Sequence, residues 1–80
     1  KSYKDGSWKI NGDVTIRDLN RTFDLDLPDE EASTIAGLVI HESRTIPLVG
    51  QEFIFHNLKI KVLIKNQNRI KALKIWFEKL

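Results

Sequence analysis

The chain has 80 residues, of which 41% are hydrophobic and 30% charged, and its net charge is +2; this balance is typical of one small soluble domain. The absence of cysteine excludes a disulfide framework and a thiolate metal site, and it favours a cytoplasmic protein. No apolar run approaches the roughly 20 residues that cross a bilayer. Because the chain starts at Lys1 and contains no methionine, we interpret residues 1–80 as one domain of a longer protein.

A short strand and a helix are predicted first. Residues 7–10 alternate in hydrophobicity, as a half-buried strand does. Asn11-Gly12 predicts a tight turn, because both residues tolerate a positive φ at little cost. A helix then runs through Arg21, with Asp13 or Thr15 as its N-cap.

A second helix is predicted to begin at Pro28, since proline suits the first helical turn. The acidic run at residues 29–31 fits a helix N-terminus, which favours negative charge. Helical spacing predicts a buried face made of Ala32, Ile35, Ala36, Val39 and Ile40 and widened by Leu38. Gly37 costs about 1 kcal/mol relative to alanine inside a helix, so we expect another backbone segment to pass close to it.

Three strands are predicted in the second half, at residues 52–56, 58–65 and 69–77, after a connector at 46–50. In the last strand Ile70 and Leu73 fall in opposite phases, so we expect a β-bulge near Lys71–Ala72. The order strand, helix, helix and three strands predicts an α+β fold. Its two helices pack on one face of a four-stranded, largely antiparallel sheet.

Charge is distributed unevenly along the chain. Residues 1–56 carry six basic and ten acidic side chains, whereas residues 57–80 carry seven basic and one acidic. Such polarity suggests that the basic end meets an anion or an acidic surface. The alternative is that these lysines form the solvent face of an amphipathic sheet.

The acidic cluster Asp24, Asp26, Asp29 and Glu30 is the nearest approach to a cation site. Its D-x-D opening is similar to a calcium loop, but the glycine at the sixth position and the distal glutamate are absent. We therefore predict no metal site, and these four residues are the only candidates for one.

Catalysis is not predicted. His41 and His56 have no carboxylate at metal-ligand spacing, the serines lack a nucleophile-elbow context, and the four glycines form no phosphate loop. Nucleic-acid binding is not predicted either, because the apolar phase of the basic strands is aliphatic and is needed for the core.

The segment DGSWKINGDVTIRDLN, Asp5 to Asn20, resembles the opening of the HlyC/CorC transporter-associated domain. In that family D-G-S-[WY]-x-[VI]-[DN]-G leads into an I-x-D-L-N helix. Further matches are Leu27-Pro28-x-Glu30-Glu31, Thr34 to Val39, Ile46-Pro47-x-x-Gly50-x-x-Phe53 and Arg69-Ile70-Lys71. The family's Gly-Arg-Ile-Pro is replaced by Ser43-Arg44-Thr45-Ile46-Pro47, so we expect a different exit from the second helix.

The resemblance implies a C-terminal domain that follows a pair of CBS domains, often behind a membrane transport domain. Such proteins are linked to magnesium and cobalt efflux, and some are called haemolysin-like. It thus implies a non-catalytic accessory or regulatory domain that requires no cofactor and is cytoplasmic, at the cytoplasmic face of the inner membrane in a full-length protein. The alternative is a module that binds FAD or an adenine nucleotide, implied by a similar fold in FAD-binding proteins. It would need backbone N–H groups around Gly12 close to Lys or Arg side chains.

Self-association is the last prediction. The final segment 75–80 is more apolar than a disordered tail, and Trp76 lies in the opposite phase from Ile75. An exposed tryptophan at a sheet edge is a candidate interface anchor. We predict a weak homodimer whose interface contains Trp76, Lys71 and Lys74. The alternative is that Trp76 folds over the sheet edge or packs against another domain.

Overall fold

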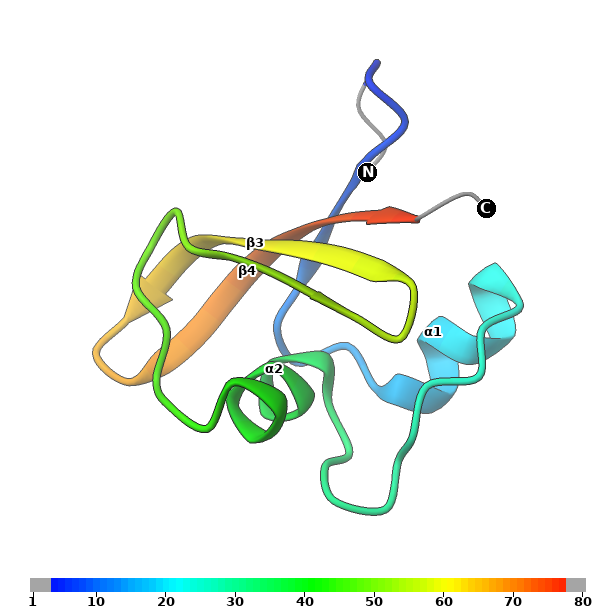
Figure 1. The fold of residues 1–80 in the computed structure, drawn as a ribbon, viewed down its shortest axis with the longest axis horizontal. Coiled ribbons are helices and arrows are strands. Elements are labelled where there is room, and N and C mark those ends of the chain that lie inside the picture. Colours follow the sequence, from blue (N-terminus) through cyan, green and yellow to red (C-terminus); the bar gives the residue numbers. More distant parts are fainter. Residues whose placement is uncertain (1–3, 78–80) are drawn as a thin grey trace.

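The structure is a computed structural model that describes residues 4–77 as two helices and one four-stranded sheet (Figure 1). In chain order, the elements are β1 (Trp8–Asn11), α1 (Ile16–Phe23), α2 (Ile35–Ser43), β2 (Glu52–Phe55), β3 (Leu58–Asn66) and β4 (Arg69–Phe77). The strand order is β1-β4-β3-β2, and all neighbouring strands are antiparallel. The predicted α+β class and element order are therefore confirmed. Residues 78–80 of the predicted interface segment lie outside the described residues.

The core lies between the two helices and one face of the sheet, and both helices lie on the same side of the sheet in Figure 1. Ile60, Val62, Leu73 and Ile75 of the central strands are fully buried. The helices contribute Ile16, Leu19, Ile35, Leu38 and Val39. Because side chains alternate along a strand, the residues between these buried positions point to the opposite face, which neither helix covers.

Threonines cap both helices, and the two helix starts are tied together. The Oγ1 of Thr15 accepts a hydrogen bond from the Asp18 N–H, and the Oγ1 of Thr34 accepts one from the Gly37 N–H, each at 3.1 Å. The two threonines also face each other in an isolated antiparallel bridge. Thr15 is thus confirmed as the first N-cap. Neither helix in the described part of the chain is long and apolar enough to cross a membrane.

The second helix begins at Ile35 and not at Pro28, so this prediction was wrong. The segment before it is a loop that the side chain of Asn20 holds against α1 through the backbone of Leu27. The Leu27 side chain is itself buried. Pro28 and the acidic run 29–31 therefore lie in this loop and not at a helix N-terminus.

The close backbone approach occurs at Gly12, and the prediction of one at Gly37 was wrong. A Cβ built on Gly12 would lie 2.0 Å from the carbonyl oxygen of Ile70, whereas one on Gly37 would meet only the side chains of Ala32 and Thr34 at 3.2 and 3.3 Å. Neither Asn11 nor Gly12 has a positive φ. Gly12 is thus required for space, because the backbone directly after β1 passes against β4.

The predicted bulge is confirmed. The pairing of β3 with β4 shifts around Ile64, which lies opposite Ala72, and returns to its original register at Lys65 opposite Ile70. This irregularity allows Ile70 and Leu73, which are three residues apart, to be buried at 5% and 0% exposure.

Candidate functional site

Four lysines and one tryptophan gather on the face of the sheet that the helices leave uncovered. Lys9 of β1 lies opposite Lys74 of β4, which in turn lies opposite Lys61 of β3. In the next position along the sheet, Lys59 lies opposite Trp76. We call these five residues (Lys9, Lys59, Lys61, Lys74 and Trp76) the lysine face. Its residues come from β1, β3 and β4. Because these strands are neighbours in the sheet, their lysines form one positively charged surface.

The indole ring of Trp76 lies close to the ammonium groups of two of these lysines. The Lys59 Nζ lies 5.1 Å and the Lys74 Nζ 4.8 Å from the ring centroid. Both distances are within the range of a cation–π attraction. Trp76 is half-buried, and its ring lies beside two ammonium groups from neighbouring strands.

One carboxylate of the chain already lies on the lysine face. The Oδ1 of Asp5 accepts hydrogen bonds from the N–H and the hydroxyl of Ser7, and its Oδ2 lies 3.1 Å from the Lys74 Nζ. The hydrogen bonds from Ser7, aided by the charge of Lys74, hold the pKa of the Asp5 carboxyl well below its usual range. The Ser7 side chain is completely buried, so its hydrogen bonds hold the Asp5 carboxylate against the folded domain.

A second carboxylate borders the same surface. The Oε1 of Glu52 on β2 lies 3.4 Å from the Lys59 Nζ. Asp5 therefore lies against the middle lysine of the row Lys9, Lys74 and Lys61. Glu52 lies at the other end of this row, directly opposite Lys61.

The structure brings together two of the three residues of the predicted interface. Trp76 and Lys74 are neighbours on the lysine face. Lys71 lies at the strand irregularity and lines a separate small depression with Asp13 and Arg69. The contribution of Lys9 and Asp5 was missed. The alternation along β3 predicts that Lys59 and Lys61 share a face. Only the pairing of β1 with β4 shows that Lys9 and Asp5 lie on the same face.

The structure separates the four candidate cation ligands. Asp24 and Asp26 line a depression of about 360 Å³ together with His56. Asp29 instead lies across a different depression and faces Arg17, and Glu30 is exposed on the loop beside it. Within residues 4–77, no group of three or more His, Asp or Glu side chains is arranged to hold a metal ion.

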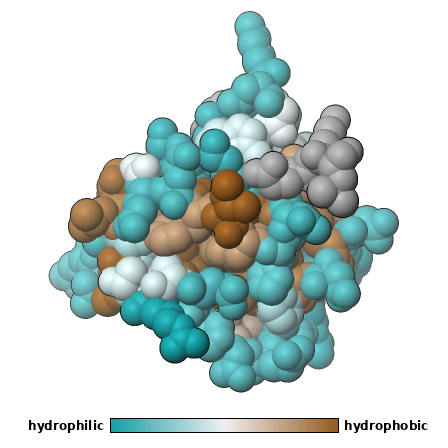
Figure 2. Space-filling view, viewed as in Figure 1, coloured by the Kyte–Doolittle hydropathy of each residue, from teal (hydrophilic) through white to brown (hydrophobic). Residues whose placement is uncertain are grey.

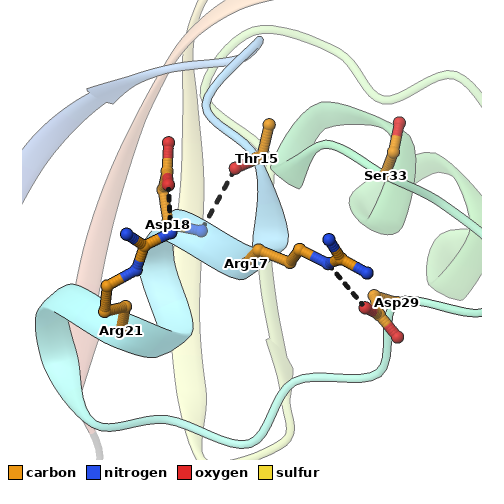
Figure 3. A pocket seen from close by; sticks show the side chains of 6 residues that line it. All are labelled: Thr15, Arg17, Asp18, Arg21, Asp29 and Ser33. Atoms are coloured by element: carbon orange, nitrogen blue, oxygen red, sulfur yellow. Dashed lines mark hydrogen bonds and ion pairs between the residues drawn. The ribbon is translucent and has the colours of Figure 1, made fainter.

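A depression of about 520 Å³ lies where the two helices begin (Figure 3). Its charged groups already pair within the chain: Arg21 lies 3.2 Å from Asp18, and Arg17 lies 3.8 Å from Asp29. The Arg17 side chain is 84% exposed, so water screens this pair strongly. The arrangement is that of a solvated surface with mutually paired charges.

The surroundings of Gly12 do not form a phosphate-binding loop. The Gly12 N–H donates to the Lys71 carbonyl at 2.9 Å, and the Gly12 carbonyl accepts from the Ala36 N–H at 3.0 Å. The depression beside it has a volume of about 170 Å³, whereas pockets for drug-sized ligands and cofactors usually span roughly 300–1,000 Å³. The main-chain donor that a nucleotide would need is therefore already used by the fold.

An apolar surface lies along edge strand β2, the connector before it and the end of β3, and it borders the lysine face because Ile54 lies opposite Lys59. Its exposed members are Ile46, Leu48, Val49, Ile54 and Ile64. Figure 2 shows such apolar side chains in brown among the hydrophilic surface. Ile54 is 66% exposed, and β2 is an edge strand in the order β1-β4-β3-β2.

Two curated relatives cover most of this chain. The Escherichia coli K12 inner membrane protein YfjD is 31% identical over 72 residues, which are 90% of this chain and 17% of that protein. The magnesium and cobalt efflux protein CorC of Buchnera aphidicola is 34% identical over 66 residues, which are 82% of this chain and 23% of that protein. The chain thus spans less than a quarter of either relative.

Solved structures share the whole fold. A conserved Haemophilus influenzae protein of unknown function has a TM-score of 0.91 and 34% identity, covering 96% of this chain and 95% of that one. A region of Neisseria meningitidis, described as associated with a putative Mg2+ and Co2+ transporter (CorC), has a TM-score of 0.89 and 29% identity, covering 95% and 94%. A Xylella fastidiosa haemolysin domain described in complex with Mg++ and Mn++ has a TM-score of 0.86 and 25% identity, covering 99% and 96%.

A family profile matches almost the entire chain. Residues 1–79 match the CorC_HlyC family, described as the transporter associated domain. The motifs from Asp5 to Ile75, the described fold and the relatives agree with this match. The chain therefore belongs to the CorC_HlyC family of transporter-associated domains.

Proposed function

We propose that this chain is the non-catalytic accessory domain of a magnesium- and cobalt-efflux-type protein and that it modulates ion transport through contacts with other domains. The observation that carries the proposal is the match of residues 1–79 to a transporter-associated domain. It is supported by the 34% identity to a protein named for magnesium and cobalt efflux. Fold alone is a weak warrant for function, but here the sequence match covers the same residues as the fold.

In this proposal the domain follows a pair of CBS domains at the cytoplasmic face of the inner membrane. Two observations support the placement: the chain spans only 17% and 23% of its relatives, and the Escherichia coli relative is described as an inner membrane protein. The CBS pair and the membrane transport domain are then the partners in the same chain.

The test is an efflux measurement on the full-length gene product that carries this segment. The protein is expressed in a bacterial strain without its own exporters, either intact or with residues 1–80 removed. Cellular magnesium and cobalt are then measured while the external concentration is varied. We expect the truncated protein to reach the membrane in normal amount but to respond differently to the ion concentration.

The matched control replaces residues 1–80 with a flexible Gly/Ser linker of equal length, so that chain length is preserved. Identical efflux curves for the intact and truncated proteins, at equal membrane abundance, would contradict a modulating role. Complete loss of the protein from the membrane would instead assign the domain a role in assembly, which also contradicts modulation.

We further propose that the domain acts without a bound nucleotide or flavin. The engaged main-chain groups of Gly12 and the depression of about 170 Å³ beside it support this proposal. Calorimetric titration of the 80-residue domain with FAD, ATP and AMP is expected to give no heat beyond dilution at millimolar ligand. Saturable heat from any of the three would overturn the proposal and favour the nucleotide-binding alternative.

A further inference from the structure

We propose that two copies of this chain associate through the outer edge of β2, so that their sheets join into one continuous sheet across a two-fold axis at Ile54. The inference goes beyond the proposed accessory function and does not depend on it. It rests on the main-chain hydrogen-bonding groups along β2, on the exposed side chain of Ile54 and on a register in which the strand complements itself.

The main chain of Ile54 points away from the rest of the sheet. In an antiparallel strand, the main-chain groups of successive residues face alternately toward one neighbouring strand and toward the other side. The Gln51 carbonyl accepts a hydrogen bond from the Val62 N–H at 3.1 Å, so the odd-numbered residues of β2 face β3. Glu52 and Ile54 therefore direct their N–H and carbonyl groups outward.

The turn after β2 leads to the same assignment. Phe55 lies opposite Leu58, and the two residues between them, His56 and Asn57, have φ angles of 53° and 62°. This is the geometry of a two-residue hairpin. The residues that flank such a turn exchange both main-chain hydrogen bonds with each other. Phe55 thus faces β3, and Ile54 again faces outward.

No other strand of the described chain occupies this outer edge. β2 is the last strand in the order β1-β4-β3-β2, and within residues 4–77 no main-chain hydrogen bond from outside the sheet reaches Ile54. The Ile54 side chain is 66% exposed. An edge strand with outward main-chain groups is a template for a further strand, so the geometry favours an extended segment as the occupant.

A second copy of β2 supplies such a segment in a register that brings similar side chains together. Directly opposite residues in an antiparallel pair point to the same face of the sheet. With the two-fold axis at Ile54, this side chain lies against Ile54 of the second copy, and Phe53 lies opposite Phe55 of the second copy. The first contact removes exposed apolar surface from water, and the second is a favourable aromatic cross-strand pair.

The neighbouring register, with the axis at Phe53, is less favourable. It also joins outward-facing main-chain groups, but it places Ile54 opposite Glu52 of the second copy. The Glu52 carboxylate lies 3.4 Å from the Lys59 Nζ and would have to share its surroundings with an apolar side chain. Matching Ile54 with its own copy avoids this arrangement, so the axis is placed at Ile54.

The charges around β2 do not oppose this contact. In the proposed register the two copies of Glu52 are separated by four residues along the strands, or roughly 13 Å. Lys59 lies opposite Ile54 on β3, so the two copies of Lys59 are three strand spacings apart, or roughly 14 Å. Both separations exceed the Debye length of about 8 Å at physiological salt, and the repulsion is therefore largely screened.

The opposite edge of the sheet is less suited to self-association. Its strand β1 carries Lys9 among its four residues, and a lysine on an edge strand opposes pairing. The four residues of β2 include neither lysine nor proline. Of the two edges of this sheet, β2 is the one that lacks these protective residues.

The weak homodimer predicted from the sequence thus receives a different interface. That prediction places Trp76, Lys71 and Lys74 of β4 at the contact, whereas β3 lies between β4 and the edge strand β2. A contact between two four-residue strands is small beside the roughly 1,600 Å² of a standard interface. We therefore expect weak association, which becomes visible at submillimolar to millimolar protein concentration.

The first test uses single-cysteine variants, because the parent chain contains no cysteine. Opposite residues of a hydrogen-bonded pair have Cα atoms about 5.5 Å apart, within the range of about 4.4–6.8 Å that a disulfide spans. Ile54→Cys is expected to form a covalent dimer on mild oxidation at least about tenfold faster than Ile64→Cys. Ile64 is the matched control, since it is also exposed, at 48%, but lies on β3.

Sedimentation equilibrium at rising protein concentration measures the association without a covalent bond. Ile54→Lys places two lysines opposite each other at the axis and is expected to weaken the dimer by about tenfold or more. Ile64→Lys makes the same change away from the axis and is expected to alter the affinity by less than about twofold. Both side chains are exposed, so both variants should fold, and amide NMR spectra verify this.

Three outcomes would overturn the proposal. They are a parent chain that stays monomeric at millimolar concentration, equal rates of oxidation for the two cysteine variants, and a dimer that Trp76→Ala weakens but Ile54→Lys does not. The last result would place the interface on the lysine face. None of these results bears on efflux by the full-length protein, so the failure of this inference is distinguishable from the failure of the proposed function.

Discussion

The side chain of Asn20 forms two hydrogen bonds with the backbone of Leu27. Its Oδ1 accepts from the Leu27 N–H at 2.9 Å, and its Nδ2 donates to the Leu27 carbonyl at 3.1 Å. The carboxamide therefore satisfies both backbone hydrogen-bonding groups of Leu27 in the loop between the helices. It also brings the Leu27 side chain into the core at 4% exposure, which is why α2 starts later than the sequence suggests.

Replacing Asn20 with alanine is expected to lower the free energy of unfolding by about 1–3 kcal/mol, because it leaves the N–H and the carbonyl of Leu27 without partners. Urea denaturation followed by tryptophan fluorescence measures the change. Thr22→Ala, on the exposed face of the same helix, is the control and should stay within about 0.5 kcal/mol of the parent. Equal effects of the two substitutions would show that the Leu27 contacts contribute nothing to stability.

Gly12→Ala is expected to destabilise the domain by about 1–3 kcal/mol or more, because the new methyl group overlaps the Ile70 carbonyl and backbone must move. Gly37→Ala is the matched control. There the helix gains about 1 kcal/mol from the better helix former, and contacts at 3.2 and 3.3 Å offset part of the gain. Thermal and urea unfolding of both variants measure the difference. A Gly37→Ala variant that is the less stable of the two would contradict the close approach at Gly12.

The Asp5 carboxyl has a depressed pKa in the folded domain, so it contributes stability that is present above its unfolded pKa of about 3.9. This contribution is lost as the pH falls through the lower folded pKa. Asp5→Asn should therefore be less stable than the parent at pH 7, and the difference should shrink below about pH 4. Parallel urea titrations at several pH values measure it.

The controls for Asp5 separate its two neighbours. The hydrogen bonds from Ser7 are the main cause of the depressed pKa, so Ser7→Ala should raise the pKa of Asp5 more than Lys74→Gln does. An NMR titration of the Asp5 carboxyl carbon reads the pKa directly. A larger rise for Lys74→Gln would assign the depression to the lysine charge instead.

Magnesium is expected to leave the melting temperature unchanged once ionic strength is matched with sodium chloride. A folded-state site would add about 1.4 kcal/mol of stability at tenfold excess over its Kd, yet Asp29 lies toward Arg17 and away from Asp24 and Asp26. Calorimetric melting in millimolar magnesium, with cobalt and manganese in parallel, provides the measurement. A saturable rise that Asp24→Asn and Asp26→Asn abolish would restore the cation site.

Local signals were sufficient for most of the fold. Alternating apolar residues predicted the positions of β3 and β4, and the phase change between Ile70 and Leu73 located the bulge. Thr15 was one of the two residues predicted as the first N-cap. These features depend on neighbours within a few residues of the chain. The prediction that α2 begins at Pro28 failed because a contact from Asn20, seven residues before Leu27, holds that segment as a loop.

The sequence by itself determined the strands, the turns and the family, because periodicity and short motifs are properties of adjacent residues. Only the tertiary structure decided which charges meet. Lys9 and Lys74 come from opposite ends of the chain and face each other because β1 pairs with β4. In that register Ile10 packs against the core and Leu73 is buried on the helix side, which leaves the lysines on the other side. Gly12 likewise has its role through the backbone of a distant strand, a contact that no local pattern contains.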